Sequence, residues 1–259
     1  MEESAVSNWS HEETQMAFVL YMMLPPSQIR ADNEDVIALA QAIGRSPKAV
    51  KAKLYNIAAH DANRTKEGRR GLSHGSAYDE AIWEEFAADP DAFLESATNL
   101  LSKAVAGNQQ PPHLVYDYIE QLPVGKERPA QTTQRINQAY FRNTLLKNYD
   151  GHCCVTGMDI PQLLIASHIK PWKASDPATE RLAASNGLLL NALHDKAFDQ
   201  GLITLDNDYR IIVSSTVSRT SSAEEWLYRF AGEQITLPQV MPPDPRFIEY
   251  HNDVIFKRA

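Results

Sequence analysis

Residues 154–213 read CVTGMDIPQLLIASHIKPWKASDPATERLAASNGLLLNALHDKAFDQGLITLDNDYRIIV and carry the most informative pattern in the chain. An apolar run typical of a buried strand ends at His168. Asn186 comes directly before a second apolar run, and His194 lies inside a short helical pattern. Residues 202–213 alternate as a hairpin around a central polar turn. The pattern predicts a strand, a second apolar segment, a short helix and a hairpin, in that order.

Four pieces of this stretch resemble, in order, the motifs of the HNH nucleases, which form the ββα-metal family. The pieces are Cys154-Val155-Thr156-Gly157, Ser167-His168-Ile169-Lys170-Pro171-Trp172, Asn186-Gly187-Leu188-Leu189-Leu190 and Leu193-His194-Asp195-Lys196-Ala197-Phe198-Asp199. The resemblance covers roughly residues 137–256. It implies a metal-dependent DNA endonuclease, and an α+β fold in which a ββα-metal domain follows the N-terminal half of the chain.

The resemblance also implies roles for three side chains. His168 would be the general base, because a neutral imidazole can take a proton from water near pH 7. Asn186 would orient the site or touch the metal, and His194 would be a metal ligand. Phosphodiester hydrolysis further needs a stabiliser for the charge on phosphorus, which one divalent cation can supply. We expect Mg²⁺ or Mn²⁺, with Zn²⁺ or Ni²⁺ as further choices.

One position departs from the pattern of the family. Many HNH enzymes have an aspartate directly before the base, where this chain has Ser167, and a hydroxyl is a poor ligand for a hard dication. We expect Asp199 to be an additional ligand, with Asp195 as the alternative. The departure also leaves a second hypothesis open, namely a DNA-binding or regulatory protein whose HNH fold does not cut.

Bulk composition describes a chain without a secretory or membrane-spanning pattern. No apolar run reaches the roughly 18 residues that a transmembrane helix needs, and residues 1–8 are acidic and polar. The two cysteines are adjacent and cannot form a disulfide framework, so we expect a cytoplasmic protein. The net charge of −8 argues weakly against nucleic acid. Residues 45–70, however, hold eight basic side chains against two acidic ones.

The sequence pattern of the N-terminal half predicts a helix-turn-helix or winged module. Ser10 with Glu13 forms a capping-box pattern, a second helix spans residues 32–43, and Ser46-Pro47 begins a third, lysine-rich helix. In that motif the later helix can lie in the major groove, although a lysine-rich solvated face is the plainer interpretation. The basic residues of a polar loop over residues 60–76 are candidates for phosphate contacts, with a mobile surface loop as an equal alternative. The predicted DNA-binding residues are Arg45, Ser46, Lys48, Lys51, Lys53, Arg64, Lys66, Arg69, Arg70 and, near the base, Lys170.

Composition shifts predict three parts of the chain: a helical DNA-binding domain over 1–106, a linker over 107–135 and a nuclease domain over 136–259. A fused reader and cutter suggests restriction or defence against foreign or modified double-stranded DNA. Cutting both strands would need a homodimer or two events. A further alternative keeps the nuclease but gives the N-terminal module a protein partner.

Overall fold

The computed structural model describes residues 8–64, 77–106, 128–238 and 240–258. The described part is helix-rich and holds two small antiparallel sheets, each with two strands. The chain divides into two compact units, unit 1 over Met1–Asn143 and unit 2 over Thr144–Ala259. None of the helices in the described ranges is long and apolar enough to cross a membrane.

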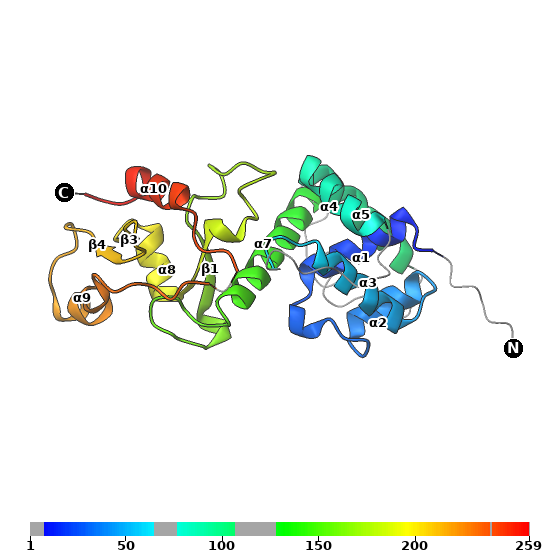
Figure 1. Cartoon of the computed structure of the whole chain (residues 1–259), viewed down its shortest axis with the longest axis horizontal. Helices are drawn as coiled ribbons and strands as arrows, with labels where there is room; N and C mark the ends of the chain where they lie inside the picture. The colour runs from blue at the N-terminus through cyan, green and yellow to red at the C-terminus, as the bar shows by residue number, and fades with distance from the viewer. Residues whose placement is uncertain (1–7, 65–76, 107–127, 239, 259) are drawn as a thin grey trace, which may run out of the picture. The chain divides into compact units, whose positions relative to one another are not determined.

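Unit 1 is built around one buried helix. Helix α1 (His11–Met23) buries ten consecutive residues, Thr14 to Met23, so it has no solvent-facing stripe along most of its length. The helices that pack on α1 are α2 (Glu34–Ala42), α3 (Pro47–Ala59), α4 (Tyr78–Ala88) and α5 (Pro90–Val105), and a short 3₁₀ helix η1 (Pro26–Gln28) follows α1 (Figure 1). Unit 1 is therefore organised, over its described residues, by helices packed on one buried helix.

Local signals in the sequence set the ends of these helices. The Ser10 hydroxyl accepts from Glu13 N while the Glu13 carboxylate accepts from Ser10 N, which confirms the predicted capping box. Ser46 caps α3 by accepting from Ala49 N, with Pro47 in the first turn. Helices α2 and α3, joined by the short turn at Gly44, are the two helices of the proposed helix-turn-helix.

Buried ion pairs in unit 1 take two of the predicted DNA contacts out of solvent. Lys53 Nζ bonds to Asp79 Oδ1, and both side chains are almost fully buried. Arg64 lies over the rings of Tyr21 and Tyr140 and pairs with buried Asp61. A buried charge is stable only with such a partner, and neither cation can reach a phosphate from this position. We therefore leave Lys53 and Arg64 out of the DNA-binding surface proposed below.

Helix α7 (Arg128–Asn148) begins inside the segment predicted to be a linker, whose residues 107–127 lie outside the described part. Most of this helix, up to Asn143, belongs to unit 1. The Tyr140 hydroxyl donates to Asp61 at 2.8 Å, and Asn143 Nδ2 donates to the Met23 carbonyl at 3.0 Å. These polar contacts are long-range, so a composition shift could not reveal them.

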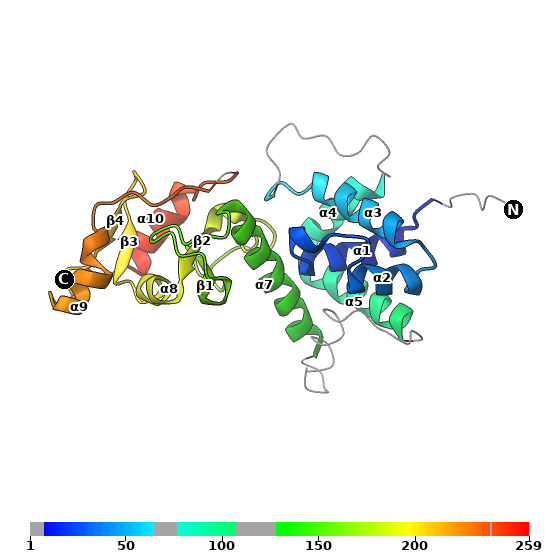
Figure 2. The same cartoon turned by 90° about the horizontal axis from the view of Figure 1, so that it is seen from below.

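Unit 2 contains the predicted ββα arrangement. Strand β1 (Leu164–His168) pairs antiparallel with β2 (Gly187–Asn191), and α8 (Ala192–Asp199) follows β2 without a loop. The remaining elements are η2 (Pro161–Leu163), η3 (Ala184–Asn186), β3 (Ile203–Leu205), β4 (Ile211–Val213), α9 (Ser221–Trp226), η4 (Tyr228–Phe230) and α10 (Pro245–Val254). Figure 2 shows α8 beside β1 and β2. The helix contacts both of these strands and also β3.

Candidate active site

The register of the β1–β2 pair places His168 at the end of β1, opposite Gly187. His168 Nε2 lies 2.9 Å from the Arg181 carbonyl oxygen. A carbonyl can only accept, so Nε2 carries the proton and Nδ1 carries the lone pair in the neutral ring. Burial lowers the pKa of His168 below its ordinary value, and the bond to the Arg181 carbonyl opposes this. The ring is therefore neutral at pH 7, as a general base requires.

His168 lines a pocket of about 310 Å³. Trp172 forms one wall, with its ring edge-on to the imidazole at a centroid distance of 5.6 Å. Two carboxylates of α8, Asp195 and Asp199, line the same pocket, and the remaining lining residues are Ile165, Ala166, Ser167, Pro171, His251 and Ile255. The pocket thus joins a neutral imidazole, an aromatic wall and an acidic pair.

Asp195 and Asp199 lie one helical turn apart, on the same face of α8. Burial raises the pKa of Asp195, while the nearby Ser167 hydroxyl lowers it. Burial and the Asp195 charge raise the pKa of Asp199. The Ser167 Oγ is buried, and Ser167 lines the same pocket as the Asp195 carboxylate whose pKa it lowers. Both carboxylates would gain from a bound cation, because it would offset their burial and their mutual repulsion.

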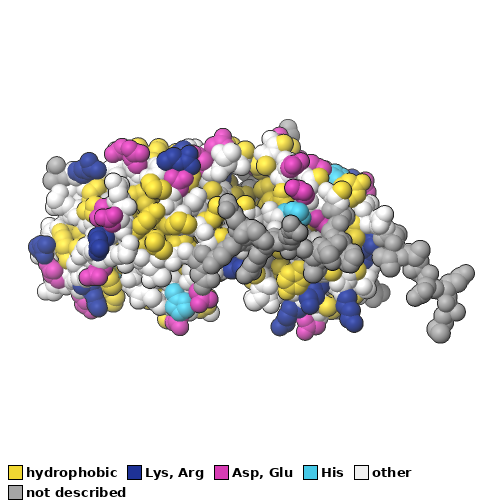
Figure 3. All heavy atoms as spheres, in the orientation of Figure 1, with side chains coloured by type: hydrophobic (Ala, Val, Ile, Leu, Met, Phe, Trp, Pro, Cys, Tyr) yellow, Lys and Arg dark blue, Asp and Glu magenta, His cyan; other side chains and the backbone are white. Residues whose placement is uncertain are grey.

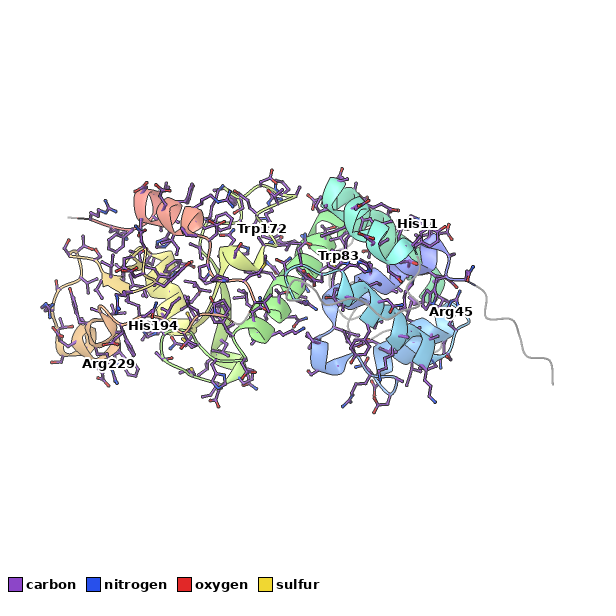
Figure 4. The ribbon with its side chains drawn as sticks, in the orientation of Figure 1. His11, Arg45, Trp83, Trp172, His194 and Arg229 are labelled. Atoms are coloured by element: carbon purple, nitrogen blue, oxygen red, sulfur yellow. The ribbon has the colours of Figure 1, made fainter. Side chains whose placement is uncertain are left out.

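His194 does not line this pocket. Its Nδ1 lies 3.0 Å from Asn191 Oδ1, and its ring packs edge-on against Phe230 at 5.1 Å. In Figure 4, His194 and Trp172 lie well apart within unit 2. Consecutive helix residues point about 100° apart, so the rotation that brings Asp195 to His168 turns His194 away. Of the three expected ligands of this helix, Asp199 and its alternative Asp195 line the pocket, and His194 does not.

Asn186 is fully buried and organises the loop between β1 and β2. Its Oδ1 accepts from Lys170 N at 2.8 Å, and its Nδ2 lies within hydrogen-bonding distance of Lys170 O, Ser175 Oγ and Glu180 O. The side chain does not line the pocket. Of the two roles expected for Asn186, the geometry supports orienting the site.

His251 lines the pocket but is held in packing, and the sequence pattern did not single it out. Its ring stacks on Phe198 at a centroid distance of 3.8 Å. Nε2 lies 3.1 Å from the Phe198 carbonyl, and Nδ1 lies 2.8 Å from Thr204 Oγ1. Burial lowers the pKa of His251 to about 4. His251 is therefore a neutral wall rather than a second base.

The donor set of the pocket suits a hard divalent cation. No three His, Cys, Asp or Glu side chains group into a complete metal site within the described ranges. Asp195 and Asp199 provide two carboxylates that face the pocket. Mg²⁺ is commonly held by one or two carboxylates, with water and substrate phosphate completing its shell. These two residues fit such an ion.

The predicted DNA-binding residues fall into different environments. Lys170 Nζ is bound to Glu180 Oε2 at 2.6 Å. The Arg45 side chain is ion-paired with Glu13 at 2.7 Å and stacks on Trp9. Lys48 and the cap residue Ser46 are exposed on α3, and Lys51 is half-exposed beside the Tyr55 ring. Lys66, Arg69 and Arg70 lie outside the described residues.

Comparison with known proteins gives one finding. Residues 153–206 match the family model described as HNH endonuclease. No curated protein matches the chain. The matched segment holds β1, β2 and α8, and with them His168, Asp195 and Asp199. In this segment, which forms the middle of unit 2, the chain is similar to the HNH endonucleases, and this similarity points to nuclease activity on DNA.

Proposed function

We propose that the protein is a metal-dependent DNA endonuclease with His168 as its general base. The observation that carries the proposal is the shared pocket, in which the neutral His168 ring faces the same space as Asp195 and Asp199. A base alone or an acidic pair alone would be unremarkable. Together, within a segment similar to HNH endonucleases, they supply the two functions that phosphodiester hydrolysis needs.

In this proposal His168 Nδ1 takes a proton from water while the Arg181 carbonyl stabilises the Nε2–H that faces it. The resulting hydroxide attacks phosphorus, and the bond to the departing oxygen breaks. Asp195 and Asp199 would hold the divalent cation, and such a cation would supply charge stabilisation for the phosphate and the leaving oxygen. Trp172 bounds the pocket and restricts the positions open to the imidazole and the substrate.

The rival hypothesis, a DNA-binding protein that no longer cuts, rests on Ser167. Support against the rival comes from Asp195 on α8, because the Ser167 hydroxyl lies close enough to its carboxylate to lower its pKa. The Asp195 carboxylate thus lies beside Ser167, the position at which many HNH enzymes have an aspartate. We therefore favour the enzyme.

Replacing His168 by Ala should abolish nicking of supercoiled plasmid in Mg²⁺ or Mn²⁺, with a loss on the order of 10²–10⁴, because a positioned base contributes that much. His152→Ala is the matched control, since His152 is exposed and does not line the pocket. Gel electrophoresis of plasmid forms over time measures the rate. Equal cleavage by wild type and His168→Ala would contradict the proposal, and so would a wild type that cuts nothing.

We further propose that unit 1 binds double-stranded DNA through α3, and that this DNA-binding unit and the nuclease domain act together in restriction or defence. Support comes from the exposed stripe of Lys48, Ala52 and Tyr55, with Lys51 beside it. Ala52 is small enough to let the helix approach a groove. Figure 3 shows Lys and Arg side chains along the edge of unit 1 that carries α2 and α3.

The double substitution Lys48→Gln and Lys51→Gln should weaken DNA binding and reduce the salt dependence of affinity. Each lost phosphate contact lowers the slope of log K against log salt by about 0.9, so the expected change is about 1.8 for two contacts. Fluorescence anisotropy of the full chain with EDTA, over a range of salt, measures the slope. Lys103→Gln is the control, because Lys103 is exposed on α5. An unchanged slope in the double variant would favour a protein partner for unit 1.

A further inference from the structure

Lys170 and Glu180 form an ion pair at the start and near the end of the loop between β1 and β2. Lys170 Nζ lies 2.6 Å from Glu180 Oε2, and the two side chains are only 19% and 25% exposed. The same Glu180 oxygen accepts from Asp176 N at 2.8 Å. The Lys170 ammonium also lies over the Tyr250 ring, 5.5 Å from its centroid. Lys170 is therefore held from several sides and does not line the pocket.

The residue after Glu180 bears the carbonyl that binds His168. The Arg181 carbonyl accepts from His168 Nε2. The Glu180 carbonyl lies 3.2 Å from Asn186 Nδ2, which also bonds to the Lys170 carbonyl. The Arg181 side chain stacks on Trp172, and its Nε donates to the Trp172 carbonyl. The Lys170–Glu180 pair thus joins the two ends of the loop next to the Arg181 carbonyl, which determines the tautomer of His168.

We propose that the Lys170–Glu180 pair is a positioning device for His168, acting through the Arg181 carbonyl. This inference rests on the proposed role of His168 as base. It replaces the expectation that Lys170 contacts DNA phosphate. Neither side chain of the pair touches substrate or the reacting atoms. Their effect is to keep the Arg181 carbonyl within hydrogen-bonding distance of His168 Nε2. Nε2 then stays protonated, and Nδ1 keeps the lone pair that accepts a proton from water.

The two assignments of Lys170 give opposite results for Glu180→Gln. If Lys170 binds phosphate, releasing it from Glu180 strengthens DNA binding and leaves the base unaffected. If the pair positions the base, the same substitution lowers kcat by roughly tenfold, a part of the 10²–10⁴ that a positioned base supplies, and leaves KM unchanged. Lys170→Met should act in the same way. The swapped pair Lys170→Glu with Glu180→Lys should recover part of the loss.

The experiment uses the full chain with supercoiled plasmid and Mn²⁺, together with nitrogen-15 NMR of the histidine rings. We expect wild-type His168 to be protonated at Nε2, and Glu180→Gln to show a mixture of tautomers with little change in the unfolding midpoint. Glu224→Gln is the control, because Arg219 and Glu224 also pair at 2.6 Å but are 68% and 49% exposed. It should change neither readout.

Unchanged kcat and an unchanged tautomer in Glu180→Gln would overturn the inference, as would tighter DNA binding at constant kcat. If Glu180→Gln does not fold, Lys170→Met and the swapped pair decide by the same two readouts. The NMR result separates this inference from the proposed function. A wild-type protein that cuts no DNA would contradict the proposed nuclease activity. The tautomer of His168 would still show whether the Lys170–Glu180 pair positions the ring.

Discussion

Asp195→Asn should abolish metal-dependent cleavage, with a loss of about a hundredfold or more, while His194→Gln should keep most of the activity. The amide keeps the size of the carboxylate but removes the negative charge that attracts a hard cation. His194 points toward Phe230 and Asn191 instead of the pocket. Plasmid nicking across Mg²⁺ and Mn²⁺ concentrations measures both variants. Asp199→Asn should weaken the response to metal less than Asp195→Asn, because the Asp199 side chain is more exposed to solvent than that of Asp195.

Thermal unfolding provides the second measurement for this pair of variants. A cation that binds only the folded protein raises the unfolding midpoint, so Mn²⁺ should stabilise wild type and His194→Gln but not Asp195→Asn. His194→Gln should be less stable without metal, by about 1–3 kcal/mol, because it disturbs a buried ring. A normally folded His194→Gln that neither cuts nor responds to Mn²⁺ would restore His194 as the ligand.

Gly201→Ala should destabilise unit 2 by about 3 kcal/mol or more, which is large for a single methyl group. Gly201 lies between α8 and β3 at φ +67°, where an alanine is strained. An added Cβ would also lie 2.1 Å from the Ile255 carbonyl oxygen and 3.0 Å from its carbon. These are backbone atoms, so the end of α10 must move. Because Ile255 and His251 line the pocket, cleavage should fall together with stability.

Gly157→Ala is the matched control for this prediction. Gly157 has a similar backbone conformation, φ +72°, but an added Cβ would meet no atom within 4 Å. It should cost only about 1 kcal/mol, the penalty for the left-handed backbone. Urea denaturation of both variants separates the strain of the backbone from the clash with Ile255. Equal losses at the two positions would show that the contact with α10 contributes nothing.

Features that depend on neighbours in the chain were predictable from the sequence. Ser10 and Ser46 cap helices because their hydroxyls bond to amides three residues ahead. The apolar run before His168 forms β1, and the sequence order of β1, β2 and α8 agrees with the ββα pattern. Backbone hydrogen bonds and side-chain periodicity decide these elements, and both are short-range properties that the order of residues determines.

The direction in which each element packs was decided only by the tertiary structure. The sequence contains His194 and Asp195 side by side, and both are plausible ligands. The helix rotation that lets α8 bury Phe198 turns Asp195, and not His194, into the pocket that His168 lines. In the same way, Lys53 and Arg64 belong to a basic window of the sequence but are neutralised inside unit 1 by Asp79 and Asp61. Residue order determined the local elements and placed His168 at the end of β1. Long-range packing selected which charges meet, because burial of a charge depends on partners that lie far away along the chain.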